Sequence, residues 1–315
     1  MITIINDDLR AIKPSGDIDF FNCDPPYAEV VQESIVSSSV EKKGDYGLNI
    51  RVKDLPFAPV TLELMGAIMN HYALARRWCL LFCDSKSVSF WHHIARRKGV
   101  RARRDLVWNR WSSPLPGNTK PPHTFEMVLT FHTPKNKLHW NGSGGFVTPN
   151  AEDDFDESWT FDQKALRGDA KFDCEKPLDM QLEQMLFFTD PGEHGCDLTC
   201  GSGTNPIAAW LLGRDCVGVE QNRDTYKIAV DRSVRAQRGV WEDRDIERMA
   251  RFCLKHPEAA STVIKNSRCS ALEKRVELTI AQNRRAEEKR LLNMLASDAA
   301  MKSRLEKKVK ALYGI

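Results

Sequence analysis

An aspartate, two prolines and a tyrosine, DPPY, stand directly after the apolar stretch 17–23. Neither proline can donate a backbone hydrogen bond, so the segment makes a stiff turn rather than more strand or helix. The turn offers the acceptors and the aromatic face that would hold an exocyclic amino group on a planar base. Asp24 and the carbonyl of Pro25 can accept its two hydrogens, and Tyr27 can stack on the ring. Held in this way, the nitrogen lone pair leaves conjugation and can attack an electrophilic methyl group. Taken alone, the motif would equally fit a plain exposed turn.

A second constellation lies between residues 196 and 220, where an apolar strand leads into a turn, a helix and a second strand ending on Glu220. The turn consists of Gly201, Ser202, Gly203 and Thr204. In such a βαβ unit glycines let a ligand approach the backbone, and the later carboxylate accepts hydrogen bonds from ribose hydroxyls. The stretch predicts a site for a nucleoside-containing cofactor, although Gly-Ser-Gly alone would also fit an ordinary strand-to-helix turn.

The turn favours one kind of cofactor over others. It lacks the full GxGxxG of a dinucleotide site and the GK[ST] of a P-loop, so no lysine is present to hold phosphates. Asp197, near the end of the first strand, suits a neutral or cationic ligand. Asp197 can meet the charged amino end of S-adenosylmethionine, and Glu220 can meet its ribose.

Short apolar runs that alternate with helix-like stretches must position these residues. We expect strands over 17–23, 77–83, 103–109, 125–132, 195–200 and 215–220. We expect helices over 61–76, 86–98, 178–189, 204–213 and 222–238. This alternation predicts an α/β fold, a doubly wound and mainly parallel Rossmann-like sheet.

Three segments depart from this rhythm. Residues 28–60 and 133–172 are rich in Gly, Pro, Ser and Asp and are interpreted as long loops inserted into a domain of residues 1–240. Beyond about residue 240 strand signals stop, which indicates a helical appendage over 241–315. Ser297 or Asp298 could cap a separate last helix, packed as a helical hairpin or as a coiled coil.

Together, DPPY and the stretch DLTCGSGTNPIAAWLLGRDCVGVE resemble the amino-methyltransferases of DNA, which methylate adenine N6 or cytosine N4. Because DPPY precedes the glycine turn, the order is similar to that of the permuted β group of this family. Flanking segments agree in order, among them IINDDL, DLVWNR and EKPLDMQLEQML, so the resemblance covers roughly residues 3–235.

The resemblance implies roles for the matching residues. Asp24, Pro25, Pro26 and Tyr27 would form the catalytic motif. The cofactor would be held by Gly201, Ser202, Gly203, Thr204, Asp197 and Glu220, with Lys176 near its methionine moiety and Asp8 near its adenine. Two departures bear on this assignment. The family usually has Asp-Pro-Phe where this chain has Asp197-Leu198-Thr199, and Asp7 stands where the family has glycine.

DNA is the implied partner, and a base inside a duplex must be flipped out to reach such a site. Candidate DNA-binding residues lie in two loops and in the appendage: Lys42, Lys43, Arg51, Lys53, Arg110, Lys120, Arg284 and Arg285. From Ile246 onward the chain has 16 Lys and Arg against 8 Asp and Glu, a net charge of +8, whereas the rest carries −5. A basic appendage suits a polyanion, and a solvated helix explains the same charges.

We therefore expect an S-adenosylmethionine-dependent DNA methyltransferase specific for adenine N6, because Asp rather than Ser opens the motif. The alternatives are a cytosine N4 enzyme and a non-catalytic DNA-binding or assembly protein that retains the fold. Methyl transfer to RNA or to a protein amide ranks lower. No metal site is expected, since the nine cysteines form no CxxC pair. The sequence indicates a cytoplasmic protein without a membrane segment, and leaves open a homodimer and a restriction endonuclease partner.

Overall fold

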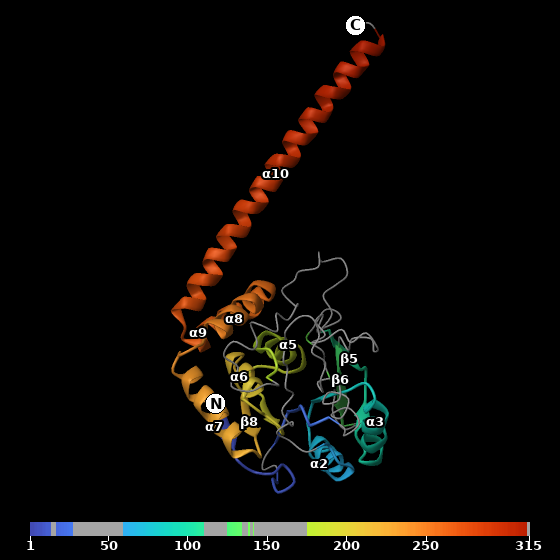
Figure 1. Cartoon of the computed structure of the whole chain (residues 1–315), viewed down its shortest axis with the longest axis vertical. Coiled ribbons are helices and arrows are strands. Elements are labelled where there is room, and N and C mark those ends of the chain that lie inside the picture. Colours follow the sequence, from blue (N-terminus) through green and yellow to red (C-terminus); the bar gives the residue numbers. More distant parts are fainter. Residues whose placement is uncertain are drawn as a thin grey trace, which may run out of the picture.

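The computed structural model of the 315-residue chain describes residues 1–13, 17–27, 59–109, 125–133, 138, 141 and 175–313. Within them lies one sheet with the strand order β1-β8-β7-β2-β3-β6-β4, and β5 pairs with β6 (Figure 1). The strands are β1 (Ile2–Ile5), β2 (Phe20–Cys23), β3 (Trp78–Cys83), β4 (Arg101–Ala102), β5 (Leu106–Asn109), β6 (Phe125–His132), β7 (His194–Asp197) and β8 (Asp215–Val219). The first five in spatial order run parallel, and β6 is antiparallel to its neighbours. The predicted mainly parallel α/β sheet is confirmed.

Alternation along β2 divides the core between the two faces of the sheet. Phe20 packs with α5 (Leu178–Phe188) and α6 (Thr204–Leu211), whereas Phe21 packs with α2 (Leu62–Tyr72). Both phenylalanines are almost fully buried. Helices therefore cover both faces, as a doubly wound sheet requires.

The chain connections leave β7 and β2 in opposite directions. α6 leads from β7 to β8 on one face, and α2 leads from β2 to β3 on the other, where α3 (Val88–Arg97) also packs. Because β7 and β2 are hydrogen-bonded neighbours, their carboxyl ends form a topological switch point. Open α/β sheets bind ligands at such points.

Polar residues start the helices on either side of the sheet. The Thr61 hydroxyl accepts a hydrogen bond from the backbone N–H of Leu64 at 3.1 Å and so begins α2. The Asn222 side chain accepts from the N–H groups of Asp224 and Thr225 and begins α7 (Arg223–Gln237). These caps satisfy donors that a helix N-terminus otherwise leaves unpaired.

The chain after α7 is helical, as expected, but its division is different. It forms α8 (Asp243–Lys255), α9 (Pro257–Ser267) and α10 (Ser270–Tyr313). The prediction of a separate last helix beginning at Ser297 or Asp298 is wrong. No Gly or Pro interrupts 270–313, and its many Ala, Leu, Glu, Lys and Arg residues are strong helix formers that outweigh one Ser-Asp pair.

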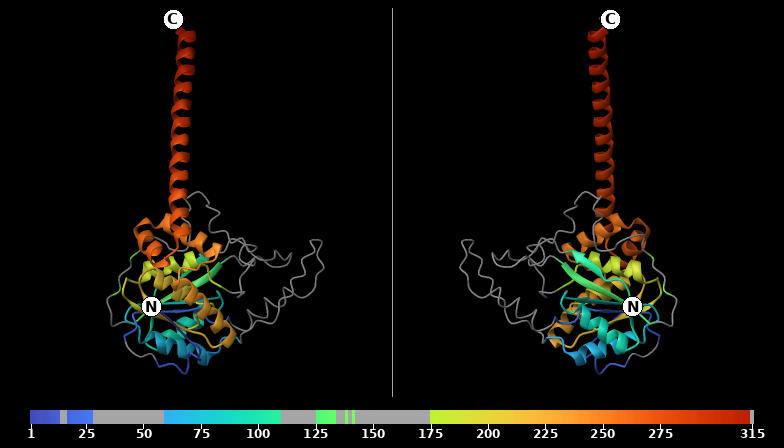
Figure 2. Two further views of the ribbon diagram at one scale, coloured as in Figure 1. Left: turned by 90° about the vertical axis from the view of Figure 1, so that its left-hand side faces the viewer. Right: turned by 90° about the vertical axis from the view of Figure 1, so that its right-hand side faces the viewer.

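α10 rises from the body as a long projection (Figures 1 and 2). Its start is buried: Leu272 and Val276 join the core cluster that contains α5 and α6, together with Phe252 of α8 and Val263 of α9. This core continues across residue 240. The division into a domain of residues 1–240 and an appendage remains a prediction.

Some predicted features fall outside the described residues. These are almost all of the loops 28–60 and 133–172 and the candidate DNA-binding residues Lys42, Lys43, Arg51, Lys53, Arg110 and Lys120. Two short strands, β1 and β4, were not among the predicted ones. Across the described part of the chain, no helix has both the length and the hydropathy to span a membrane.

Candidate active site

The DPPY turn begins directly at the carboxyl end of β2 and is tied down at both ends. The backbone N–H of Asp24 donates to the Thr199 hydroxyl at 2.8 Å, and the carbonyl of Tyr27 accepts from Val60 at 3.3 Å. Pro25 is buried, whereas Asp24 and Tyr27 are half-buried. The turn is thus a fixed corner at the switch point between β2 and β7.

Thr199 explains one departure from the family pattern. It follows β7, where the family usually has Asp-Pro-Phe, and its hydroxyl lies 3.3 Å from the Cys23 sulfur as well as bonding Asp24. The preceding Leu198 is buried, and its N–H donates to the Asn22 carbonyl at 3.0 Å. A proline at 198 could not make that bond. Leu198 and Thr199 therefore join β7 to β2, a role that the sequence patterns did not predict.

Lys176 lies against the catalytic aspartate. Its ammonium nitrogen is 2.6 Å from Oδ2 of Asp24 and 3.3 Å from Oε2 of Glu126, and it sits 4.9 Å from the Phe82 ring centre and 5.7 Å from that of Trp108. The side chains of Lys176 and Glu126 are 11% and 6% exposed. Burial strengthens such contacts, since little water screens them. The predicted role of Lys176 beside the methionine moiety stays untested.

The glycine turn uses backbone conformations that favour glycine. Gly201 has a φ of 53° and Gly203 one of 83°. A Cβ on Gly203 would also stand 3.4 Å from that of Ala229 in α7. Glycine avoids the steric cost of the left-handed region, so these residues let the chain turn sharply from β7 into α6.

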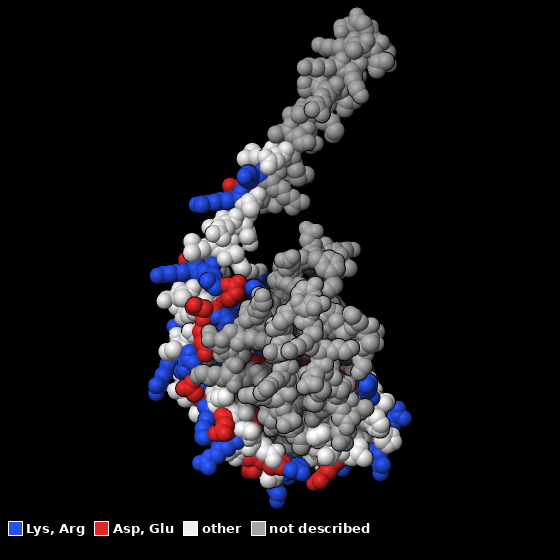
Figure 3. Space-filling model, viewed as in Figure 1, with Lys and Arg blue, Asp and Glu red and all other residues white. Residues whose placement is uncertain are grey.

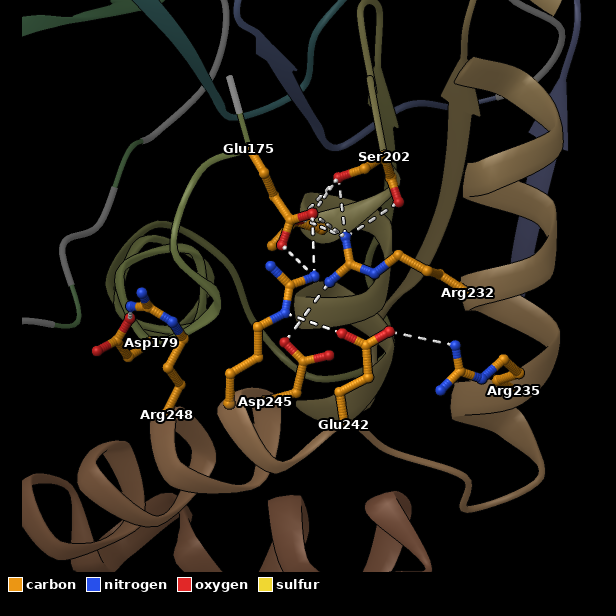
Figure 4. A network of polar contacts seen from close by, with 10 residues as sticks. Glu175, Asp179, Ser202, Arg232, Arg235, Glu242, Asp245 and Arg248 are labelled. Carbon is orange, nitrogen blue, oxygen red and sulfur yellow. Dashed lines mark hydrogen bonds and ion pairs between the residues drawn. The ribbon is translucent and has the colours of Figure 1, made fainter. Parts of the chain in front are cut away.

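The hydroxyls of the glycine turn point back into the protein. Those of Ser202 and Thr204 accept from Arg232 Nη1 at 2.8 and 3.0 Å, and Ser202 also donates to Glu175 at 3.1 Å (Figure 4). Arg232 is buried. These side chains hold the shape of the turn, so contact with a cofactor through them remains a prediction.

Glu220 closes the turn from the end of β8. One of its carboxylate oxygens accepts from the N–H of Gly201 at 3.1 Å, and the other accepts from the N–H of Asn222 at 2.7 Å. Burial raises the pKa of Glu220 above its ordinary value, against these two hydrogen bonds. The carboxylate predicted to meet ribose hydroxyls thus also fixes the glycine turn.

Asp197 is the most deeply buried of the predicted acidic residues, 3% exposed at the end of β7. Burial, followed by the charges of Asp24 and Glu220, raises its pKa to about 7, although the N–H of Thr199 donates to it. A nearby cation would offset this cost of ionisation. The site therefore fits a ligand that brings positive charge.

Asp8 lies after β1, next to β8 in the sheet. Its carboxylate accepts from the side chain and backbone of Arg10, which hold its pKa below the ordinary value. The neighbouring Asn6 donates to the carbonyl of Glu220 at 2.8 Å. The structure thus brings the segment around Asp8 close to the end of β8, and its predicted contact with adenine is untested.

The remaining predicted site residues, Arg284 and Arg285, lie exposed on α10. Figure 3 shows Lys and Arg side chains standing out from this helix above the body. Their role in binding DNA is untested.

The sequence profile of the DNA methylase family, which covers N6 and N4 enzymes, matches residues 72–231. The chain belongs to this family. The matched range contains the glycine turn but begins after DPPY. A search of curated proteins found no match.

The chain is similar to solved structures. The M1.HpyAVI–S-adenosylmethionine complex aligns with a TM-score of 0.50 and 18% identity over 74% of this chain and 99% of that one. PvuII DNA methyltransferase, described as cytosine-N4-specific, aligns with a TM-score of 0.47 and 14% identity over 84% of this chain and 93% of that one. A putative DNA modification methylase from Thermus thermophilus, complexed with S-adenosylmethionine, aligns with a TM-score of 0.45 and 16% identity over 75% of this chain and 94% of that one.

As a DNA methylase, the chain is an S-adenosylmethionine-dependent DNA methyltransferase. The described residues fit that cofactor, because Asp197 is buried with a raised pKa and Glu220 stands beside a glycine turn with left-handed residues. A cationic ligand would offset the cost of ionising Asp197, and the glycine turn allows a ligand to approach the backbone closely.

Proposed function

We propose that the chain methylates the exocyclic N6 of adenine in DNA at a specific sequence, with Asp24, Pro25, Pro26 and Tyr27 as its catalytic motif. One observation carries this proposal. Asp24 directly follows β2 and Asp197 ends the adjacent strand β7, so the acceptor of the amino group and the candidate cofactor carboxylate meet at the switch point. An aspartate at position 24, rather than serine, supports adenine over cytosine.

The turn would act by orienting the acceptor amine. Asp24 accepts one amino hydrogen, the Pro25 carbonyl accepts the other, and Tyr27 stacks on the base. Pro26 keeps the corner rigid. When bound, S-adenosylmethionine would supply an electrophilic methyl group to the oriented amine, with the carbon–sulfur bond breaking as the carbon–nitrogen bond forms and the extra amine proton passing to water. Orientation provides most of the rate, and no covalent enzyme intermediate is needed.

Cofactor binding is proposed for the opposite side of the switch point. Asp197 would pair with the cationic amino end, Glu220 would accept from the ribose, and Gly201 to Thr204 would line the backbone approach. Asp8 completes the proposed set near the adenine. Lys176 would stand near the methionine moiety through its pairing with Asp24 rather than as a direct contact of the cofactor. The target base must leave the duplex to reach this edge of the sheet.

The test is expression in a bacterial host that lacks DNA methylation, followed by sequencing with detection of modified bases. N6-methyladenine at one sequence context is the expected outcome, and the Asp24→Ala variant should abolish it. N4-methylcytosine would make the chain a cytosine enzyme. Unmodified DNA in the presence of folded protein would favour a non-catalytic DNA-binding role. Since the proposed substrate is cellular DNA, we also propose that the chain acts in the cytoplasm.

A further inference from the structure

Two consecutive residues, Glu175 and Lys176, reach opposite sides of the candidate active site. Both lie just before α5, and their side chains are 10% and 11% exposed. Glu175 contacts the glycine turn, whereas Lys176 contacts the catalytic aspartate. A short backbone segment thus bridges the two parts that must meet during methyl transfer.

Glu175 belongs to a network of charged groups that surrounds the glycine turn (Figure 4). Its carboxylate lies 3.1 Å from the Ser202 hydroxyl, 3.0 Å from Nη1 of Arg232 and 3.4 Å from Nη2 of Arg244. The same Nη1 of Arg232 donates to the Ser202 carbonyl at 3.2 Å. One carboxylate is therefore tied to the turn both directly and through a buried guanidinium.

The network extends into the appendage. Nη2 of Arg232 lies 3.6 Å from Asp245 of α8, and Arg248 of the same helix donates to Asp179 in α5 at 2.8 Å. Figure 4 shows Glu175, Arg232 and Asp245 converging, with the Arg248–Asp179 pair to one side. The segment carrying Glu175 is therefore held on several sides.

Lys176 turns from this segment toward the DPPY corner. Its ammonium lies between the carboxylates of Asp24 and Glu126, at 2.6 and 3.3 Å, with Phe82 and Trp108 nearby. Buried ion pairs often stabilise a protein less than apolar side chains of similar size. Their geometry is directional, however, and it fixes the orientation of the carboxylate that must accept the amine.

We propose that Glu175 and Lys176 form a clamp that holds the glycine turn and Asp24 at a fixed separation, with Lys176 as a positioning residue for Asp24. This inference rests on the proposed function, because it assigns the two sides to methyl donor and methyl acceptor. Lys176 keeps one carboxylate oxygen of Asp24 occupied and directs the carboxylate toward the amine. Glu175 keeps the cofactor side in register with it.

The experiment compares Lys176→Met, Lys176→Arg and Glu175→Gln in the full chain, by single-turnover methylation of DNA and by calorimetric titration with S-adenosylmethionine. Lys176→Met should lower the methylation rate about 100-fold, because misplacement by about 1 Å costs that much, and should change the cofactor Kd less than about threefold. Lys176→Arg keeps the positive charge, so its methylation rate should fall by no more than about 20-fold. Glu175→Gln should weaken cofactor binding about 10-fold, since it removes a charge from the network.

At limiting S-adenosylmethionine, Glu175→Gln should also slow methylation, because less cofactor is bound. Under that condition the double variant Glu175→Gln/Lys176→Met should lose less rate than the product of the two single losses, because both residues act through one segment. Lys255→Met is the matched control: Lys255 pairs with the buried Glu183 at 2.9 Å, away from both Asp24 and the glycine turn. Its rate and cofactor Kd should stay within about threefold of wild type. A merely structural lysine at 176 would instead lower the melting temperature without separating rate from affinity.

A wild-type rate in folded Lys176→Met would overturn the clamp, and so would multiplicative losses in the double variant. If Lys176→Met does not fold, Lys176→Gln decides, because it also removes the charge: a rate loss of more than about threefold with an unchanged Kd supports the clamp, and a smaller loss overturns it. Failure of the wild-type chain to methylate any DNA would instead refute the proposed function, so the two failures are distinguishable.

Discussion

The switch point divides the sheet into a cofactor half with β1, β8 and β7 and a catalytic half that begins with β2. The functional residues of the two halves are held in place differently. On the cofactor side, the glycine turn is fixed by its own half: Glu220 of β8 and Arg232 of α7 bond its backbone and hydroxyls. On the catalytic side, Asp24 is held by Thr199 and Lys176, which come from the other half of the molecule. The position of Asp24 therefore depends on the junction between the two halves, whereas the shape of the glycine turn depends on contacts within its own half.

That junction is the pairing of β2 with β7. Phe20 stands opposite Gly195, and Asn22 stands opposite Asp197. Asp197 carries a pKa raised to about 7, so ionising it costs free energy at the point where the halves touch. Changes at this junction should therefore disturb the protein most, and changes in α10 least.

The largest expected effect is the pH dependence set by Asp197. Its pKa in the folded protein is about 7, above the ordinary 3.8, so between about pH 4 and 7 the folded state binds a proton that the unfolded state has released. Stability thus falls as pH rises through this range, by at most about 4 kcal/mol for a shift of this size. Asp197→Asn should remove that decline and unfold at a higher urea concentration than wild type at about pH 8.

The same residue predicts how cofactor affinity varies with pH. A cationic ligand prefers ionised Asp197, so the Kd for S-adenosylmethionine should fall from about pH 6 to 8 in wild type and stay level in Asp197→Asn. Other groups titrate in this range, so the difference between the two proteins is the quantity to measure. Equal slopes would mean that Asp197 does not contact the ligand charge.

The next largest effect concerns packing at the junction. A Cβ on Gly195 would lie 2.0 Å from the ring of Phe20. Gly195→Ala should therefore destabilise the protein by roughly 2 kcal/mol or more in urea unfolding, since an overpacked core forces neighbours to move. Gly66 of α2 has open space around its Cβ position, so Gly66→Ala should be neutral or stabilise by about 0.5–1 kcal/mol. Equal stability in both variants would contradict the tight packing between β2 and β7.

A smaller effect separates the cofactor side from the catalytic side. Glu220→Gln places an amide donor against one of two backbone N–H groups and should weaken S-adenosylmethionine binding about 10-fold, or about 1.4 kcal/mol. Asp84 accepts from the N–H groups of Lys86 and Ser87 at the end of β3, a strand that pairs with neither β7 nor β8. Asp84→Asn should lower stability by about 1 kcal/mol and leave the cofactor Kd unchanged. Calorimetric titration and urea unfolding of both variants provide the measurement.

The smallest effect is expected in α10, beyond both halves. If Arg284 and Arg285 contact phosphates, replacing each with glutamine should reduce the salt slope of DNA binding by about 1, without changing cofactor affinity or melting temperature. Arg97, exposed near the end of α3, is the matched control. The slope is measured by fluorescence anisotropy between low and moderate salt. An unchanged slope would mean that these arginines contact solvent rather than DNA phosphates.

Local features of the fold followed from local sequence. The apolar runs around Phe21, Leu81 and Val217 each became strands, because strand patterns of a few residues carry enough signal when both faces are buried. β1 was missed because four residues at the chain start resemble any short apolar run. The continuous α10 was missed because cap residues are poor signals inside a strongly helical stretch.

The types of residue in the candidate site were also predictable, since Asp24, the glycine turn and Glu220 each end a strand or begin a turn. Their supports were not. Lys176 lies 152 positions from Asp24 in the chain, and Thr199 lies 175 positions away. Glu175 was matched only as the first residue of the segment EKPLDMQLEQML, without a role of its own. Nothing in the sequence around Glu126, Glu175 or Arg232 indicates that they are buried beside charged partners.

The amino-acid sequence was therefore enough to specify the stiff DPPY corner, the glycine turn and the alternating strands, because each depends on backbone conformations of adjacent residues. Which charges meet at the switch point was decided by strand order, since β7 follows β2 by roughly 170 positions along the chain yet pairs with it directly. Pairing buries Asp197 and brings Lys176 to Asp24. Burial and proximity arise only when distant segments pack, and they set both the raised pKa and the position of the catalytic carboxylate.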